Sequence, residues 1–406
     1  MISDFMFTSE SVTRGHPDKI CDQISDAIVD QFLARDPQAR ITAESAVAKG
    51  IVFIAARFAS DARIDIPDVA RQVIHDIGYQ QGEFSARECS ILTSLSELPA
   101  ELRSASDPHD WQDSDMNALT AQHQITGFGF ACNQTEALMP MPVSLAHELA
   151  QRLAQVRASG RLPYLTPDGT VQVGVEYRNR QPRRVHSITI VVSQETADGP
   201  HLKTLREAVT EEVVHGLFTD KPVQPDQHTR IFVNPDGPRI GGGPSRHAGL
   251  TGRKTAADTY GQYARYSASA MSGKDPLRVD RVAAYAARHA AKNVVAAGLA
   301  RECEVQLSYT IGLARPVSLQ VDTFDTGLIE DSKLSRLLEQ LFDFRLGGII
   351  RGFELAHLPA RRRDGFYRRL SAYGQVGRTD LDTPWEQTDQ AEALRDMAHV
   401  KKGQRA

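Results

Sequence analysis

The chain has 406 residues, 24% of them charged and 41% hydrophobic, and its 47 basic and 51 acidic residues leave a formal net charge of -4. This length predicts two or three domains with a substantial hydrophobic core. The nearly balanced charge gives no general reason to bind nucleic acid or an anionic membrane surface, although small anions respond to local charge. No stretch approaches 18 consecutive apolar residues, so we expect no transmembrane helix.

The N-terminal residues and the cysteines favour a cytoplasmic protein. Residues 1–12 lack the basic and apolar regions of a signal peptide. The four cysteines are far apart in the sequence and form neither a CxxC pair nor a zinc-ligand spacing. We therefore expect reduced, buried cysteines and a cytoplasmic location.

Strand and helix patterns alternate along the first part of the chain. Pro17 suits the first turn of a helix, and apolar residues recur every four positions from Ile20 to Phe32, which predicts a helix over 17–35. The elements expected after it are strands at 41–47, 51–57 and 89–95 and a helix at 66–78. The polar, irregular stretch 99–115 then ends a first domain, which we place at 1–115.

The middle of the chain carries the clearest strand pattern. Hydrophobic residues alternate at 171–177 and again at 188–192, which predicts two strands with one solvated or helix-covered face. Helices are expected on either side, at 145–158 and 202–217. We assign 116–231 to a second domain.

The last part of the chain opens at Phe232 with a long loop rich in glycine and proline. An Ala-rich helix at 279–297, strands at 304–311 and 316–322 and a helix at 332–343 are expected after it. The tail after Thr379 is charged except for Trp385, and we expect it to wrap the surface. These elements define a third domain, 232–406. Alternating strands combined with helices predict an α+β fold rather than a doubly wound parallel sheet.

Three short segments carry the residues best suited to chemistry. The first, GHPDK at 15–19, opens the first helix, where backbone N–H groups and the helix dipole favour an anion. The second, 241–254, is a glycine-dense loop whose backbone can approach a phosphate closely. It is not a P-loop, because Arg253 separates Gly252 from Lys254. The third is SGKDP at 272–276.

Together these segments suggest a site for ATP or another polyphosphate. The basic residues that would hold the phosphates are Lys19, Arg253, Lys254 and Lys274. Lysine for phosphate and aspartate for Mg²⁺ is a common division of labour, so Asp18 and Asp280 are the expected Mg²⁺ ligands. Each segment also has a simpler interpretation, as a capped helix start or a surface loop, and spacing does not prove that the three meet in space.

The motifs resemble the S-adenosylmethionine synthetase (methionine adenosyltransferase) family over nearly the whole chain. The resemblance implies three similar α+β domains around a pseudo-threefold axis. It also implies a homodimer, or a dimer of dimers, with active sites between subunits. The motifs that carry it are FTSESV, GHPDKICDQISDAIVD, LMPMPVSLAHELAQRLA, GLTGRKTAADTYG, SGKDPLRVDRVAAYAARHAAKNVVAAGLA, CEVQLSYTIG and PWEQTDQAEALRD.

The resemblance further implies a reaction and residue roles. The methionine sulfur attacks C5′ of ATP, and intact triphosphate leaves and is then hydrolysed, with Mg²⁺ and K⁺ assisting. The implied catalytic residues are His16, Lys19, Arg253 and Lys274. The implied ATP-binding residues are Lys19, Phe232, Arg253, Lys254 and Lys274, with Phe232 stacking on adenine. The implied metal ligands are Asp18 and Asp280 for Mg²⁺ and Glu44 for K⁺.

The sequence departs from the family's pattern mainly where methionine would lie. His123 and His247 replace aspartates, Arg57 replaces a glutamate, Leu98 replaces a glutamine and Arg278 replaces a lysine. The resemblance assigns these five positions to the acceptor pocket. A like charge at about 4 Å costs on the order of 4 kcal/mol at an effective dielectric of about 20. We therefore expect an acceptor different from zwitterionic methionine.

Other departures lie outside that group. Thr170 replaces a phosphate-side lysine, Arg14 replaces the glutamate before GHPDK, and Ser267–Ser269 replaces a GGG. Three hypotheses follow. The first is an adenosyltransferase that uses ATP with a different, more anionic nucleophile. The second is genuine S-adenosylmethionine synthesis with a rearranged pocket, and the third is an ATP-binding paralogue that partners a synthetase.

Overall fold

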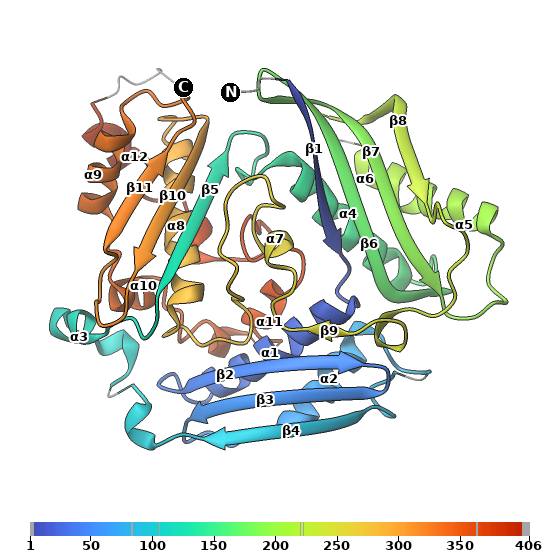
Figure 1. Cartoon of the computed structure of the whole chain (residues 1–406), viewed down its shortest axis with the longest axis horizontal. Coiled ribbons are helices and arrows are strands. Elements are labelled where there is room, and N and C mark those ends of the chain that lie inside the picture. The colour runs from blue at the N-terminus through green and yellow to red at the C-terminus, as the bar shows by residue number, and fades with distance from the viewer. Residues whose placement is uncertain are drawn as a thin grey trace.

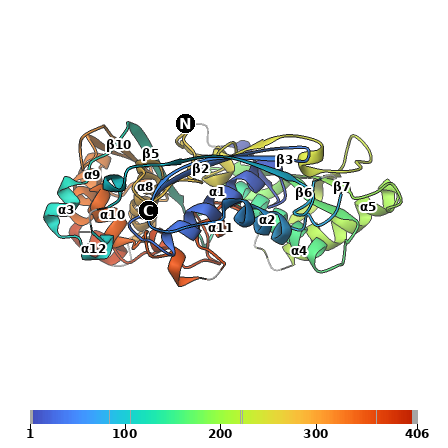
Figure 2. The same ribbon diagram turned by 90° about the horizontal axis from the view of Figure 1, so that it is seen from below.

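The strands form three sheets whose helices lie on one side, as Figure 1 shows. The computed structural model describes residues 4–399 except Glu83, Ala105, Asp220, Pro222 and Arg363. Viewed from below, the molecule is flat: the strands lie toward one face and most helices toward the other (Figure 2). The α+β class expected from the sequence is confirmed.

The first sheet contains, in order, β4 (Ser90–Glu97), β3 (Ile51–Ala59), β2 (Arg40–Ala48) and β9 (Gly249–Leu250). Helices α1 (Pro17–Leu33) and α2 (Ile66–Ile77) belong to the same unit. The four-residue apolar spacing of α1 is explained by packing, because Ile20, Ile24 and Ile28 are fully buried. β2 and β3 pair antiparallel as the sequence predicts, whereas β3 and β4 pair in parallel across α2.

The second sheet has the order β1 (Phe5–Val12), β6 (Leu165–Arg178), β7 (Gln181–Gln194), β8 (Pro225–Val233). Its helices are α4 (Met141–Ala158), α5 (Leu202–Val209) and α6 (Gly216–Phe218). The helix expected at 202–217 is interrupted, because one turn of π-helix, Thr210–His215, joins α5 to α6. The alternating residues Val171, Val173 and Val175 are fully buried, which confirms that this face packs on helices.

The third sheet has the order β11 (Ser318–Asp322), β10 (Glu302–Tyr309), β5 (Ile125–Cys132). The Ala-rich helix α8 (Val279–Ala296) packs against β5 and β10. The remaining helices are α3 (Asp113–Ala118), α7 (Thr255–Asp258), α9 (Asp331–Leu341), α10 (Leu346–Gly352), α11 (Tyr367–Leu370) and α12 (Ala391–Met397). The stretch expected to be irregular, 99–115, contains short helical turns and is anchored by the buried Trp111.

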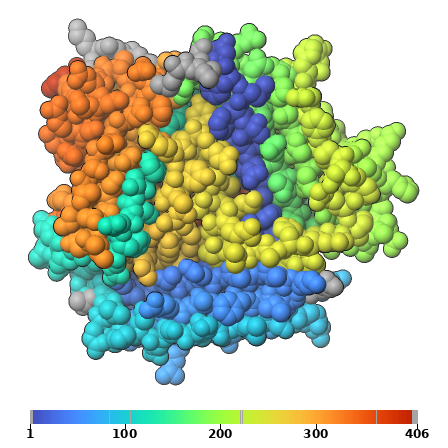
Figure 3. Space-filling view, viewed as in Figure 1, coloured from blue at the N-terminus to red at the C-terminus, as the bar shows by residue number. Residues whose placement is uncertain are grey.

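The sheets do not coincide with the chain segments 1–115, 116–231 and 232–406. Strand β1 of the first segment pairs with β6 of the second, β5 of the second pairs with β10 of the third, and β9 of the third pairs with β2 of the first. Each segment therefore contributes one strand to a neighbouring sheet. In the space-filling view, the yellow stretch that includes residues 240–270 fills the centre between the three sheets (Figure 3).

The C-terminal tail is anchored in the core rather than only lying on the surface. Trp385 is fully buried, and its ring stacks on that of Tyr285 with centroids 3.6 Å apart. Glu386 accepts hydrogen bonds from Arg288 and Lys292 of α8, both at 2.8 Å. All four cysteines are buried and free, as expected. Within the described residues, no helix is long and apolar enough to cross a membrane.

Candidate active site

His16 occupies the residue before α1 and closes the helix start. Its Nδ1 accepts a hydrogen bond from the backbone N–H of Asp18 at 3.2 Å, which satisfies one of the free N–H groups of the first turn. Burial lowers the pKa of His16 to about 4, so the imidazole is neutral at neutral pH. Because Nδ1 accepts, the ring proton is on Nε2, and His16 can donate a hydrogen bond to an anion.

The glycine-dense loop lies directly on the start of α1. The N–H of Leu250 donates to Asp18 Oδ1 at 3.1 Å, and the guanidinium of Arg253 lies 3.6 Å from the same oxygen. Gly249 permits this approach, because a Cβ at that position would lie 2.2 Å from the carbonyl carbon of Pro17. His16, Asp18 and Arg253 are therefore neighbours, although more than 230 positions separate Arg253 from the other two.

Lys254 and Phe232 belong to the outward face of the second sheet. Lys254 Nζ lies 3.5 Å from Glu10 of β1. The strand register sets Glu10 opposite Gln172, Gln172 opposite Thr189, and Thr189 opposite Phe232. These residues thus form one row across the sheet, with Phe232, which is 40% exposed, at its end. The row offers an aromatic surface and a cation on the same face.

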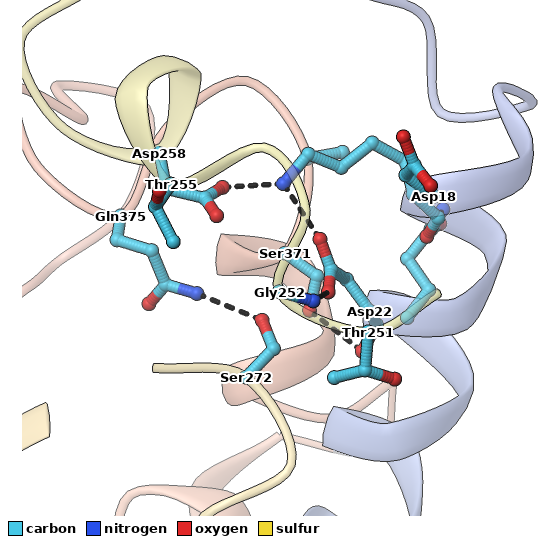
Figure 4. A network of polar contacts seen from close by, with 12 residues as sticks. Asp18, Asp22, Thr251, Gly252, Thr255, Asp258, Ser272, Ser371 and Gln375 are labelled. Atoms are coloured by element: carbon cyan, nitrogen blue, oxygen red, sulfur yellow. Dashed lines mark hydrogen bonds and ion pairs between the residues drawn. The ribbon is translucent and has the colours of Figure 1, made fainter. Parts of the chain in front are cut away.

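Lys19 is buried beneath this site, not exposed within it. Its ammonium lies 2.8 Å from Asp22 and also pairs with Asp258 of α7. Figure 4 labels these two aspartates, whose carboxylates are joined by dashed lines to one nitrogen between them. Burial alone would lower the pKa of Lys19, but the two carboxylates raise it above its usual value. The charge of Lys19 is thus used to join α7 to α1. Its role toward phosphate stays a prediction.

A second group of charged residues surrounds the start of α8. Lys274 Nζ lies 3.2 Å from Asp280 Oδ1, and His123 Nε2 lies 2.7 Å from Asp280 Oδ2. Burial would raise the pKa of Asp280, but Lys274 and His123 together hold it below its usual value. Both oxygens of this carboxylate therefore face cationic or hydrogen-bonding partners.

Arg278 and Arg57 both lie next to Thr42 on the outward face of the first sheet. Arg278 donates to Thr42 Oγ1 at 3.2 Å, and Thr42 is directly opposite the exposed Arg57 in the β2–β3 register. Glu44 is two residues further along the same face and is exposed. Leu98 follows β4, where its N–H donates to the carbonyl of Phe58 at 2.7 Å.

His247 lies next to His16 rather than next to the α8 group. Its Nε2 is 2.9 Å from Asp168 Oδ2, the same oxygen that accepts the N–H of Gly243 at 2.9 Å. The centroids of the His16 and His247 rings are 5.0 Å apart. A cavity of about 360 Å³ opens beside Asp168, His247 and Thr170. The hydrogen bond to Asp168 raises the pKa of His247 above its usual value.

The expected site residues thus fall into two groups. His16, Asp18, Arg253, Lys254 and His247 gather where α1 meets the second sheet. The other group surrounds the start of α8 and the first sheet, and contains Arg57, His123, Lys274, Arg278 and Asp280. Among the described residues, none of the hydrogen bonds or ion pairs joins the two groups directly.

Asp168 is a functional candidate that sequence reasoning missed. It lies within β6 and is only 12% exposed, yet it orients His247 beside His16. In the sequence, Asp168 is marked only by the glycine that follows it, next to the alternating pattern of a strand. An Asp-Gly pair at such a position indicates a bend in the strand, not a functional site.

The two aspartates differ in how well they fit Mg²⁺. Mg²⁺ prefers one or two carboxylates together with phosphate and water oxygens. Asp18 offers such a carboxylate, because its nearest neighbours are the Leu250 N–H and Arg253. The Asp280 carboxylate already contacts Lys274 and His123, so Mg²⁺ has to displace these residues or share the carboxylate with them. Glu44 offers one exposed carboxylate for K⁺.

Comparison with known proteins gives consistent matches along the chain. The family models for the N-terminal, central and C-terminal domains of S-adenosylmethionine synthetase match residues 4–99, 118–239 and 241–387. A protein named S-adenosylmethionine synthase from Gloeothece citriformis is 46% identical over 409 aligned residues, with 98% of each chain covered. Proteins of the same name are 46% identical in Trichodesmium erythraeum, with 97% of each chain covered, and in Synechococcus elongatus, with 98% of this chain and 99% of that protein covered.

Proposed function

The chain belongs to the S-adenosylmethionine synthetase family, and on this premise we propose that it transfers the adenosyl group of ATP to the sulfur of methionine. A bond forms between the sulfur and C5′, the bond from C5′ to the triphosphate oxygen breaks, and its electron pair leaves with triphosphate. The observation that carries the proposal is the gathering of His16, Asp18 and Arg253 at the N-terminus of α1.

The residues at the start of α1 suit a leaving triphosphate. Negative charge grows on the departing oxygen, so preplaced donors stabilise the transition state more than the ground state. Neutral His16 donates from Nε2 without carrying a charge that needs a counterion, and Arg253 supplies a permanent positive charge. Lys274, Lys254 and Lys19 complete the proposed set of cations. When bound, Mg²⁺ adds positive charge near the phosphates, with Asp18 and Asp280 as proposed ligands and Glu44 proposed for K⁺.

Two arguments support methionine as the acceptor over the more anionic nucleophile that we expected from the sequence. The relatives' names support it. The electrostatic objection is also smaller than expected, because His247 is paired with Asp168 and His123 with Asp280. In each pair a carboxylate offsets positive charge on the histidine, so neither histidine presents an isolated positive charge to the substrate ammonium.

One observation favours a second candidate, an acceptor that carries an additional negative charge. Arg57 and Arg278 both adjoin Thr42, and two guanidinium groups on one face suit recognition of a carboxylate. The comparison that separates the candidates uses two thioethers. The protein is incubated with ATP, Mg²⁺ and K⁺ and with either methionine or S-carboxymethylcysteine, and nucleoside products are identified by mass spectrometry.

We expect S-adenosylmethionine as the main product. A larger rate with S-carboxymethylcysteine would favour the second candidate and overturn methionine as the preferred acceptor. ATP binding without adenosyl transfer to either compound would instead support a binding paralogue. The same incubation, followed for phosphate and pyrophosphate, reports whether triphosphate is hydrolysed after transfer.

Assembly as a homodimer through the first sheet is also part of the proposal. Ile51, Phe53, Leu92 and Leu250 project from its outward face with 44–53% of their surfaces exposed. The register makes Phe53 a neighbour of Leu92 on one side and of Ala46 on the other, and Ala46 is opposite Leu250. A continuous apolar row of this kind is typical of a protein–protein interface. A cytoplasmic location, supported by the four free cysteines, completes the proposal.

A further inference from the structure

Two histidines and an aspartate converge beside the start of α1. One ring nitrogen of His16, one of His247 and one carboxylate oxygen of Asp168 all lie within 4.8 Å of one another. We propose that these three residues bind a single transition-metal ion of the Zn²⁺ class. Imidazole nitrogens select such ions, whereas Mg²⁺ prefers oxygen ligands only. The proposed ion is therefore distinct in chemistry and in ligands from Mg²⁺ at Asp18 or Asp280.

The geometry requires a limited adjustment of the three ligand atoms. Bonds of about 2.0–2.1 Å to a tetrahedral ion place the ligand atoms roughly 3.4 Å apart. His247 Nε2 and Asp168 Oδ2, which are 2.9 Å apart, have to separate slightly. The other ligand atoms lie within 4.8 Å of one another, so they have to approach by at most about 1.4 Å. His247 is 44% exposed, and the loop before it contains Gly241 and Gly243 with φ of 69° and 66°, which only glycine adopts readily. The exposed side chain of His247 can therefore adjust by rotation while Asp168, in β6, stays in place.

The surroundings also provide the support that metal-binding histidines need. Nδ1 of His16 lies 3.7 Å from Asp18 Oδ2. If Nε2 binds the ion, the ring proton moves to Nδ1, where Asp18 can accept it. A carboxylate that accepts from the second ring nitrogen is the usual arrangement behind a metal-bound histidine. The cost is the capping bond to the Asp18 N–H, which at 3.2 Å is long.

Three protein ligands leave a position open for water or an anion. Asp168 Oδ2 accepts from Gly243 and His247, but an ionised carboxylate has about four acceptor positions, so Asp168 can still bind an ion. The adjoining cavity of about 360 Å³ provides the space for a fourth ligand. A further consequence, which rests on the proposed function, is that an ion on His16 Nε2 prevents that nitrogen from donating to triphosphate and so slows turnover.

The binding test uses the full chain, freed of metal with a chelator and titrated with Co²⁺ in excess Mg²⁺ without ATP. We expect one equivalent of Co²⁺ with the visible absorption of a tetrahedral or five-coordinate site, and displacement by Zn²⁺. His247→Asp, which exchanges a nitrogen for an oxygen ligand, should weaken binding by about tenfold or more, and Asp168→Asn should do the same. His75→Ala, on a 57% exposed histidine of α2 far along the chain from the cluster, is the matched control.

Two results would overturn the proposal: Co²⁺ binding that is unchanged in His247→Asp and Asp168→Asn, or binding that falls equally in His75→Ala. Circular dichroism melting of each variant separates lost folding from lost ligands. Because the readout contains neither ATP nor methionine, failure of the adenosyl transfer proposed above would leave this result unaffected.

Discussion

The ammonium group of Lys19 is held between two buried carboxylates. Lys19→Met would leave Asp22 and Asp258 without their shared cation in a site that is at most 3% exposed. Removing one partner of a buried ion pair typically costs about 3–5 kcal/mol. We expect a loss of that size in the free energy of unfolding, measured by urea denaturation.

The matched control for Lys19 is Lys203→Met. Lys203 is 89% exposed and lies 4.0 Å from Glu207, so its loss should cost less than about 1 kcal/mol. Similar small losses for both variants would mean that the Lys19 cluster contributes little to folding and that Lys19 is available for phosphate instead.

His147 makes the stability of the protein depend on pH. Burial lowers its pKa in the folded state to about 3, while Nδ1 bonds to Ser11 Oγ at 2.8 Å. The unfolded chain, with a pKa of about 6.5, takes up the proton first as the pH falls, so the folded state is destabilised from pH 6.5 downward. One site of this kind costs about 1.4 kcal/mol per pH unit, or about 2 kcal/mol between pH 6.5 and 5.

The measurement for His147 compares unfolding free energies at pH 7 and pH 5 for the parent and for His147→Asn. We expect the parent to lose about 2 kcal/mol more than the variant over this interval, because only the parent has this imidazole to protonate. Parallel losses in the two proteins would show that His147 titrates normally in the folded state.

His16 offers the sharpest kinetic prediction. A donor aimed at a developing charge acts on the transition state, so His16→Ala should lower kcat by about 10²–10³ with little change in the Kd for ATP. His201→Ala, at an exposed position before α5, is the control and should change neither quantity. Equal losses in kcat and ATP affinity would mean that His16 binds the ground state only.

The sequence could predict single residues only where a motif carried them. GHPDK and the loop 241–254 led to His16, Asp18 and Arg253, which the structure brings together. The sequence could not reveal that Lys19 is buried against Asp258, 239 positions away, because a charged residue such as lysine is expected to be exposed. Nor could the sequence reveal that His123 pairs with Asp280 and His247 with Asp168, because each pair joins residues far apart in the chain, and the expected reversal of charge was therefore too strong.

At the scale of elements, β5 and α8 approach closely because β5 has no side chain where they cross. A Cβ on Gly129 would lie 1.9 Å from the carbonyl carbon of Ala287, and one on Gly127 would lie 2.7 Å from Ala283 Cβ. Gly129→Ala therefore has to separate the helix from the sheet. Overpacking of this kind typically costs about 1–3 kcal/mol, occasionally more.

Thermal or urea unfolding measures the effect of Gly129→Ala, and Gly352→Ala is the control. Gly352 ends α10, and nothing lies within 4 Å of a Cβ added there, so we expect a change within about 0.5 kcal/mol. A Gly129→Ala variant as stable as this control would show that the β5–α8 contact is able to relax.

Elements with strong apolar periodicity were predictable, and those defined by distant pairing were not. The helix at 17–35 and the strands at 41–47 and 51–57 end within two residues of α1, β2 and β3. In contrast, β1 reads as polar because Thr8 and Glu10 face outward, and its partner β6 is more than 150 residues away. Likewise, the parallel pairing of β3 with β4 depends on where the chain returns after α2, which local sequence does not encode.

At the scale of the whole molecule, the three sheets lie toward one face (Figures 1 and 2), and contacts with outward-facing strand residues bring Lys254 and Arg278 to that face. The α1 group adjoins the second sheet, whereas Arg57 and Glu44 project from the first. If two subunits pack on this face, as we propose, the partner can bring complementary groups to each group of candidate residues. Assembly and activity should therefore be lost together.

Phe53→Glu with Leu92→Glu tests this coupling. Both side chains are about half exposed in the chain alone, so the substitutions leave the fold of the subunit intact but bury charge in a dimer. We expect the mass measured by light scattering to fall to that of one chain, and adenosyl transfer to fall with it. The control is Ile311→Glu. Ile311 is 62% exposed and lies beyond the end of β10, outside the apolar row of the first sheet, so this variant should keep both the parent's mass and its adenosyl transfer. A double variant that keeps the parent's mass would exclude this face as the interface, and a monomer with full activity would show that each chain contains a complete site.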